Sequence, residues 1–216
     1  MTEKLLRAIS AKYNLIEQNV GYFRKLKANG MTFTVRTFRA EGLGWVSLMR
    51  ASGFLGLMKM DTLIINPMRV DMPLFSYDRV HAMGNDTLIF ELYDTLLGQT
   101  DLHALEDVKA AHAALPDHDL GKHWYDDIKL PQSLSKKGKK AQTPAFDALT
   151  EEYLDAFLSC CQAAAPTETA KKREKGSVYV EGLLTHGGPS TDVFKKAIGE
   201  DKTAQLFRYV LFVTKV

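Results

Sequence analysis

The segment DMPLFSYDRV, from Asp71 to Val80, places two carboxylates seven residues apart around a proline and two large apolar side chains. Asp71 has a local explanation, because an aspartate before an X-Pro step accepts hydrogen bonds from the backbone N–H groups of its own turn. Asp78 has no such explanation, since it lies where the chain enters a predicted strand. Its side chain must face solvent or a cavity, and in a cavity a carboxyl group can exchange protons with a ligand.

A second acid, Asp61, interrupts the apolar alternation of MDTLII and shares a predicted strand face with Leu63 and Ile65. A lone carboxylate on such a face must be paired, protonated or exposed in a pocket, because desolvation raises its pKa. An edge strand with a wet face explains Asp61 equally well. Asp61 is therefore a second candidate acid with two interpretations open.

Other motifs in the sequence give no positive indication of a metal, nucleotide or nucleophile site. His118 and His123 lie among four aspartates, but their spacing lacks the i, i+4 register of a helical zinc site, which favours a solvated loop and no metal. The segment THGGPST matches no nucleotide-binding pattern, and Ser190 or Thr191 is expected to cap the last helix. No G-x-S-x-G elbow occurs, so nucleophilic hydrolysis has no positive signal.

Two basic clusters, KKGKK at Lys136–Lys140 and KKREK at Lys171–Lys175, stand out in a chain whose formal net charge is only +2. Such clusters are most often solvated surface. If they converge on one face, complementary charge would favour docking of an acidic protein. The small net charge argues against wholesale nucleic-acid binding.

The chain of 216 residues is expected to form one domain, with 45% hydrophobic and 25% charged residues. It contains no apolar run of the roughly 20 residues that span a bilayer, so no membrane contact and a cytoplasmic location are expected. Cys160 and Cys161 are adjacent in a predicted helix, a poor geometry for a disulfide, and are expected to be buried or half-buried thiols.

Periodicity and turn residues predict one or two helices over residues 3–28, followed by strands and then mainly helices. The segment 71–78 is expected to be a turn, residues 117–143 a polar stretch, and Gly199 a break in the last helix. This order favours an α+β fold, with a mainly antiparallel sheet covered by helices. The predicted strands are 31–40, 44–51, 54–66, 79–83 and 87–93, and the predicted later helices are 103–115, 146–165 and 192–212.

Three segments together resemble the ferredoxin-dependent bilin reductases: DMPLFSYD at 71–78, LPDHDLGKHWYDDI at 115–128 and VFKKAIGEDKTAQLFRYVLF at 193–212. Members of that family carry an Asp-apolar-Pro-apolar-Phe-x-x-Asp segment, a Leu-Pro…Trp stretch and a C-terminal helix that ends in Val-Leu-Phe. The likeness covers roughly residues 55–212.

The resemblance implies a single domain over residues 1–216, a three-layer α/β/α sandwich in which the sheet and the C-terminal helices hold a linear tetrapyrrole such as biliverdin. It implies no metal or flavin bound by the protein itself, with reduced ferredoxin, an acidic electron carrier, supplying electrons one at a time. Asp78 matches the family's central proton donor. A bilin that gains electrons becomes more basic, so a carboxyl group with a near-neutral pKa can protonate it.

The remaining site residues follow from the same resemblance. Asp61 stands where other members carry histidine or asparagine, so it is a possible second proton site, and Trp124 belongs to the Leu-Pro…Trp stretch beside the substrate. Where several members have an acid, this chain has Gly187-Gly188-Pro189, and Asp192 is the nearest carboxylate unless it serves the helix N-terminus. Bilin propionates need cationic partners. The candidates by residue type are Arg36, Arg39, Arg50 and Arg69.

Three alternatives stay open. The chain could be a relative of red chlorophyll catabolite reductase that acts on another tetrapyrrole. It could also be a non-catalytic tetrapyrrole-binding or carrier protein on the same fold. Finally, the similarity could extend to the fold alone, since fold does not determine function.

Overall fold

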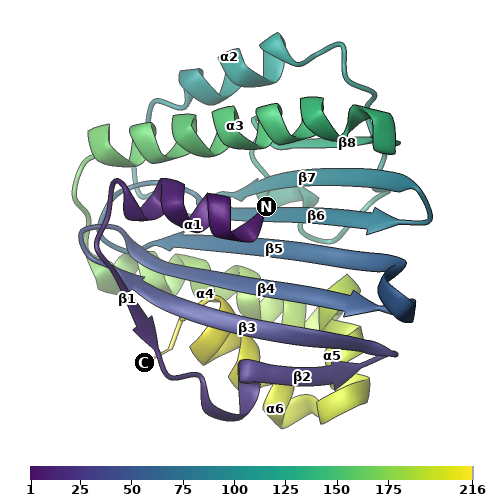
Figure 1. The fold of residues 1–216 in the computed structure, drawn as a ribbon. Coiled ribbons are helices and arrows are strands. Elements are labelled where there is room, and N and C mark those ends of the chain that lie inside the picture. The colour runs from purple at the N-terminus through teal and green to yellow at the C-terminus, as the bar shows by residue number, and fades with distance from the viewer. Residues whose placement is uncertain (216) are drawn as a thin grey trace.

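The computed structural model describes residues 1–215, and its centre is one eight-stranded antiparallel sheet (Figure 1). The main strand order is β1-β3-β4-β5-β6-β7-β8, and β2 also pairs with β3. The strands are β1 (Leu15–Gln18), β2 (Lys25–Ala28), β3 (Met31–Ala40), β4 (Gly44–Gly53), β5 (Met58–Pro67), β6 (Leu74–Ala82), β7 (Asn85–Tyr93) and β8 (Leu134–Lys139).

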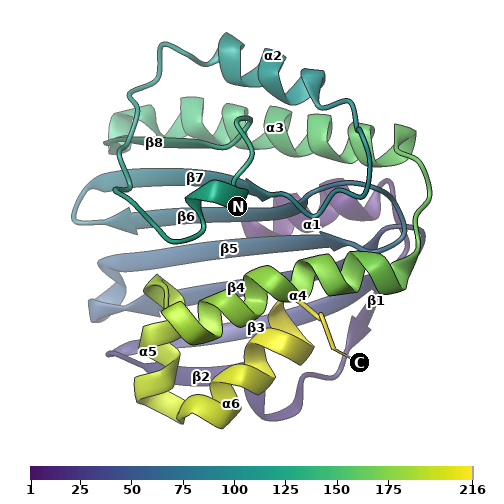
Figure 2. The same ribbon diagram turned by 180° about the vertical axis from the view of Figure 1, so that it is seen from behind.

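Helices cover both faces of this sheet. Figure 1 shows α1 (Thr2–Ser10) and α3 (Thr143–Ala163) on one side, with α2 (His103–Ala111) packed outside α3. The view from behind shows α4 (Thr169–His186), α5 (Pro189–Ile198) and α6 (Glu200–Gln205) on the other face (Figure 2). A π-helical turn, Leu206–Leu211, continues α6. The expected α+β sandwich of three layers is confirmed.

The alternation of side chains along the strands produces two separate cores. On the α1–α3 face, Phe75, Phe90 and Phe157 are fully buried. On the α4–α6 face, Ile64, Tyr179 and Phe207 are among the buried residues. Because residues i and i+2 of a strand share a face, each of the central strands β3–β7 supplies both cores.

The predicted helix over residues 3–28 is wrong beyond Ser10. Only α1 forms there, and the chain then runs through β1, a single 3₁₀ turn and β2. Both short strands pair with opposite ends of β3, Leu15 against Ala40 and Lys25 against Thr34. The free edge of β3 offers hydrogen bonds that local periodicity does not reveal, and segments of four residues are too short for periodicity to distinguish helix from strand.

Three other boundaries differ from the prediction. The turn before β5 extends to Leu57, because Phe54 and Leu55 adopt positive φ angles and are exposed. DMPLFSYD is not a turn throughout, since β6 begins at Leu74 and Asp78 lies in mid-strand. The polar stretch 117–143 contains the edge strand β8, whose lysines hide the strand pattern.

The α5–α6 region agrees with the expected final helix, whereas α4 lies outside the predicted helices. Gly199 separates α5 from α6 with a φ of 82°, a conformation that glycine adopts without steric cost. Neither Ser190 nor Thr191 caps α5, which begins after Gly188 without a side-chain cap.

The two cysteines are free thiols in α3, with Cys160 partly exposed and Cys161 buried. Within residues 1–215, none of the helices has the length and apolar character needed to cross a membrane.

Candidate active site

Asp78 points into a cavity between the sheet and the C-terminal helices. Strand pairing places Thr62 on β5, Asp78 on β6 and Ile89 on β7 in one cross-strand row, all on the face that α4–α6 cover. The cavity has a volume of about 220 Å³. Besides this row, its lining includes Met60, Val80, Glu91, Tyr93, Leu120, His123, Tyr125, Tyr179, Leu183, Gly188, Phe207 and Leu211.

The chemistry of Asp78 follows from this apolar setting. Burial raises the pKa of its carboxyl group to about 6, partly opposed by a hydrogen bond that the Thr62 hydroxyl donates to Oδ1 at 2.5 Å. The negative charge of Glu91 raises the Asp78 pKa further. The group therefore exchanges a proton near neutral pH, which is the range that a general acid needs.

The same shift makes a prediction about stability. An unfolded chain releases the Asp78 proton near pH 3.8, whereas the folded chain keeps it to about pH 6. The free energy of unfolding therefore falls as pH rises from 3.8 to about 6. Above that range the buried negative charge lowers it by about 2–3 kcal/mol. We expect Asp78→Asn to be more stable than the wild type at pH 7.5 by up to that amount, and equally stable below pH 4, in urea unfolding. Equal stabilities at pH 7.5 would contradict the buried environment.

A second carboxyl group faces the same cavity and is absent from the sequence-based candidates. Glu91 on β7 is 9% exposed, and its Oε2 accepts a hydrogen bond from the Tyr93 hydroxyl at 2.6 Å. Lys129 Nζ lies 3.8 Å from Oε1. The alternation of DTLIFELY places Glu91 on the same face of β7 as Ile89. Because Ile89 pairs with Asp78, this alternation indicates that Glu91 faces the Asp78 cavity once the register of β6 and β7 is known.

Aromatic rings form a wall of the cavity beside the carboxyl groups. Tyr93 and Tyr179 stack with centroids 3.9 Å apart, and Tyr125 meets both of them edge-on. Burial raises the pKa of the Tyr93 and Tyr179 hydroxyls well above the ordinary value, so they remain protonated at neutral pH. Such a wall suits a flat conjugated ligand.

Trp124 stands behind this wall. Its indole ring packs so closely on Gly182 of α4 that a Cβ at that position would lie 2.1 Å from the ring. The indole N–H donates to the Gly187 carbonyl at 3.0 Å. Trp124 therefore fastens the loop that carries His123 and Tyr125 to the end of α4. It does not itself line the cavity, so the substrate contact expected of it is not seen.

Asp61 and Arg50 lie on the opposite face of the sheet, which corrects their assignment to the Asp78 site. Asp61 pairs in register with Arg79, one position from the row of Asp78. Its Oδ1 accepts hydrogen bonds from Thr2 and from Arg50 Nε, the latter at 3.1 Å. Both residues line a separate groove of about 890 Å³ near α1. Asp61 is thus a paired carboxylate, and Thr62 is the residue that faces Asp78.

The other charged candidates also lie away from Asp78. Arg69 lines a surface recess with Arg39 at the end of β5, outside the Asp78 cavity. Arg36 pairs with Glu17 at the β1 edge. Asp192 is exposed in the first turn of α5 and does not line the cavity, so its place fits the alternative of serving the helix N-terminus.

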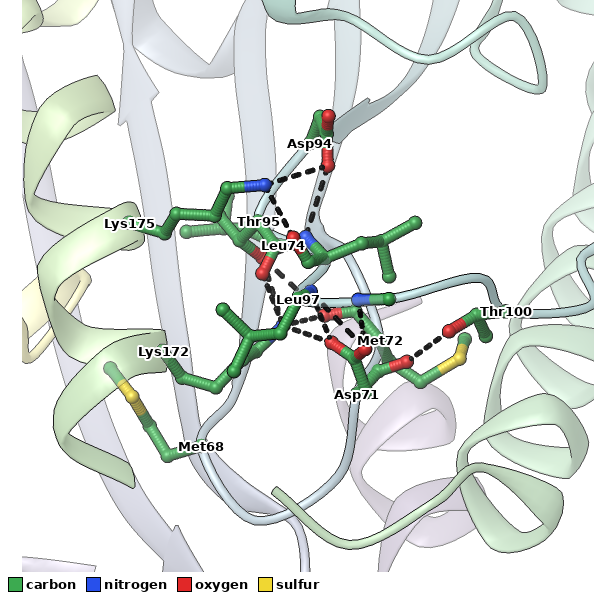
Figure 3. Close-up of polar contacts among 12 residues, drawn as sticks. Met68, Asp71, Met72, Leu74, Asp94, Thr95, Leu97, Thr100, Lys172 and Lys175 are labelled. Atoms are coloured by element: carbon green, nitrogen blue, oxygen red, sulfur yellow. Dashed lines mark hydrogen bonds and ion pairs between the residues drawn. The ribbon is translucent and has the colours of Figure 1, made fainter. Parts of the chain in front are cut away.

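Asp71 has a long-range role instead of the local one expected. It accepts hydrogen bonds from the backbone N–H groups of Leu97 and Gly98 in the loop after β7. Buried Lys172 of α4 lies 3.4 Å from Asp71 Oδ1 and donates to the carbonyls of Met72 and Thr95 at 2.6 Å each (Figure 3). We call Asp71, Thr95 and Lys172 the α4 anchor, because they join that helix to two loops of the sheet.

The two basic clusters are less available to a partner than their sequence suggests. Lys136 is 4% exposed and donates to the Leu115 carbonyl and to Asp117. Lys172 is buried in the α4 anchor. Lys137 and Lys139 are exposed at the β8 edge.

No group of three or more His, Cys, Asp or Glu side chains with metal-binding geometry occurs among the described residues. His118 and His123 lie on the loop before β8, as their composition indicated.

Searches against protein-family models and against curated proteins give no match. Among solved structures, this chain is similar to phytochromobilin synthase from tomato, whose crystal structure is a complex with biliverdin. The TM-score is 0.78 at 16% sequence identity, and the match covers 99% of this chain and 83% of the other. The chain has the phytochromobilin synthase fold. The resemblance found in three sequence segments therefore extends, as a fold, over nearly the whole chain.

Proposed function

We propose that this protein reduces a linear tetrapyrrole, biliverdin or a related bilin, with electrons supplied singly by a ferredoxin and with Asp78 as a proton donor. The observation that carries the proposal is the near-neutral pKa of Asp78 in an apolar, aromatic cavity between the sheet and α4–α6. The likeness to a fold solved with biliverdin supports the choice of ligand.

In this proposal the bilin itself is the redox group, and the protein binds it, excludes water and holds the proton. Each two-electron reduction consumes two electrons and two protons and converts one double bond of the bilin to a single bond. Two reduced ferredoxins are oxidised in the process. Asp78 supplies one proton and recovers it from solvent, and solvent supplies the second proton.

Binding requires the cavity to widen. Its volume of about 220 Å³ is below the roughly 300–1,000 Å³ of sites for drug-sized ligands, and four linked rings need more room than this. The loop with Leu120 and His123, and the Gly188–Ser190 segment, form walls that are not part of the sheet. These are the segments whose displacement would admit a bilin.

The direct test is anaerobic mixing of the protein with biliverdin and then with reduced ferredoxin, followed by time-resolved absorbance. The proposal expects a shifted spectrum on binding, a transient radical, and a blue-shifted product. Tight binding with an unchanged spectrum after reduction would instead identify a carrier, and no spectral change on mixing would remove bilins as ligands.

For the electron donor, we propose docking at the exposed lysines of the β8 edge. Lys137 pairs in register with Thr87, which pairs with Val80, so it lies on the cavity face of the sheet. Lys139 pairs with Asn85 on the same face. An acidic donor that approaches here would be close to the cavity, and complementary charge would raise its association rate.

We expect the double variant Lys137→Glu/Lys139→Glu to raise the apparent KM for ferredoxin by about tenfold or more at low salt. The difference should shrink as ionic strength increases, because salt screens exposed charges. Lys171→Glu, at an exposed lysine of the other cluster, is the matched comparison and should have little effect. A larger effect at Lys171, or a wild-type rate insensitive to salt, would contradict this docking face.

A further inference from the structure

Glu91 has a buried oxygen atom that the described residues leave without a hydrogen-bond donor. The Tyr93 hydroxyl bonds Oε2, but Oε1 is inaccessible to solvent and accepts no hydrogen bond. Lys129 Nζ, at 3.8 Å, is beyond hydrogen-bond distance and is bonded to Asp126 at 2.7 Å. An unsatisfied buried carboxylate oxygen is costly, so a site that keeps one is suited to a donor from outside the chain.

The position of Glu91 relative to Asp78 defines where that donor would lie. Glu91 pairs in register with Ser76, and Asp78 pairs with Ile89, so the two acids are diagonal neighbours on adjacent strands. Diagonal neighbours on one face lie about 7–8 Å apart. Both acids line the same cavity, so one ligand can contact both carboxyl groups at once.

The chemistry of the cavity limits what the ligand can be. Its other walls are largely apolar and aromatic, which favours a flat conjugated molecule over a small hydrated cation. Such a molecule must present N–H donors or positive charge to Oε1. A linear tetrapyrrole has both properties, because its rings carry N–H groups and the conjugated system becomes a cation when it takes up a proton.

We propose that Glu91 is the carboxylate that accepts the ring N–H groups of the bound bilin and stabilises its protonated, cationic form, while Asp78 is the acid. This inference rests on the proposed function. It assigns the two carboxyl groups of one cavity to different tasks. The influence of Glu91 on Asp78 agrees with it, since the negative charge of Glu91 raises the Asp78 pKa.

The test is Glu91→Gln, which keeps the shape of the side chain and an acceptor for Tyr93 but removes the charge. Biliverdin binding is measured by absorbance over a range of pH without any electron donor. We expect the dissociation constant to rise about tenfold, and the pH at which bound biliverdin gains its proton to fall by about one unit. Glu174→Gln, at an exposed glutamate of the same charge on α4, should match the wild type.

Lys129→Met supplies an independent test with the opposite sign. It removes the cation near Glu91 Oε1, so bound biliverdin should gain its proton at higher pH than in the wild type. If both variants bind and protonate biliverdin as the wild type does, while the wild type reduces it, the role of Glu91 is wrong and the proposed function stands. If the wild type does not bind biliverdin, both proposals are wrong.

Discussion

Asp78→Asn is expected to lower the rate of biliverdin reduction by about 10²–10⁴-fold, the usual contribution of a positioned general acid. Asparagine has nearly the same size, and its amide oxygen can still accept the hydrogen bond from Thr62. It has no proton to deliver at neutral pH. Binding of biliverdin should therefore remain within about threefold of the wild type, and reduction should stop after the electron arrives.

Asp61→Asn is the matched control for this variant. It changes the same functional group on the neighbouring strand, but on the opposite face, where Asp61 is paired with Arg50. Single-turnover absorbance with reduced ferredoxin should show nearly wild-type reduction for Asp61→Asn and an accumulated radical for Asp78→Asn. Full activity of Asp78→Asn would eliminate the proposed acid, whereas a large loss in Asp61→Asn would place the reaction on the other face.

Lys172→Met is expected to lower the free energy of unfolding by about 3–5 kcal/mol, the cost of removing one member of a buried ionic network. The Met72 and Thr95 carbonyls would lose their donor, and Asp71 would lose its cation. Burial lowers the pKa of Lys172 to about 8, so the amine is still mostly charged at neutral pH. Urea unfolding at pH 7 measures the difference.

Lys171→Met is the control for the α4 anchor. Lys171 is exposed and, among residues 1–215, pairs with exposed Glu168 alone, so its replacement should change stability by less than about 0.5 kcal/mol. Lys172 and Tyr179 are two turns apart on one face of α4, so loosening the anchor should also weaken bilin binding. Equal stabilities of the two methionine variants would contradict a structural role for Lys172.

The sequence predicts the central strands, α3 and the α5–α6 region well, because those elements are long and their periodicity is strong, but it does not predict α4. It fails at β1, β2 and β8. These strands are short or rich in lysine, and they exist because a neighbouring strand offers an unpaired edge. No local pattern contains that information.

The residues of the candidate site are likewise only partly predictable from the sequence. Asp78 is identifiable because its segment resembles a known motif, and its place in mid-strand makes it face the cavity. The family resemblance assigns Asp61 to the same site as a possible second proton donor. Strand register, however, sets Thr62 and not Asp61 opposite Asp78, and a shift of one residue reverses the face. The sequence pattern does not single out Glu91: the alternation of β7 sets it on one face with Tyr93, but only tertiary packing brings Lys129 near it and closes the cavity around it.

The basic clusters show a further limit of sequence patterns. Lys136 and Lys172 belong to charge runs that read as solvated surface, yet both are buried with their amines bonded to carbonyl oxygens. A long aliphatic stem lets a lysine cross the core and place its charge at a distant partner. Only the fold reveals which lysine of each run does so.

A crystal structure of the protein with biliverdin tests the central claim most directly. The account predicts the tetrapyrrole between the sheet and α4–α6, with a ring nitrogen about 2.7–3.2 Å from the Asp78 carboxyl group and another near Glu91 Oε1. The loop with His123 and the Gly188–Ser190 segment should be displaced outward. A tetrapyrrole in the groove lined by Arg50 and Asp61, on the other face of the sheet, would contradict it.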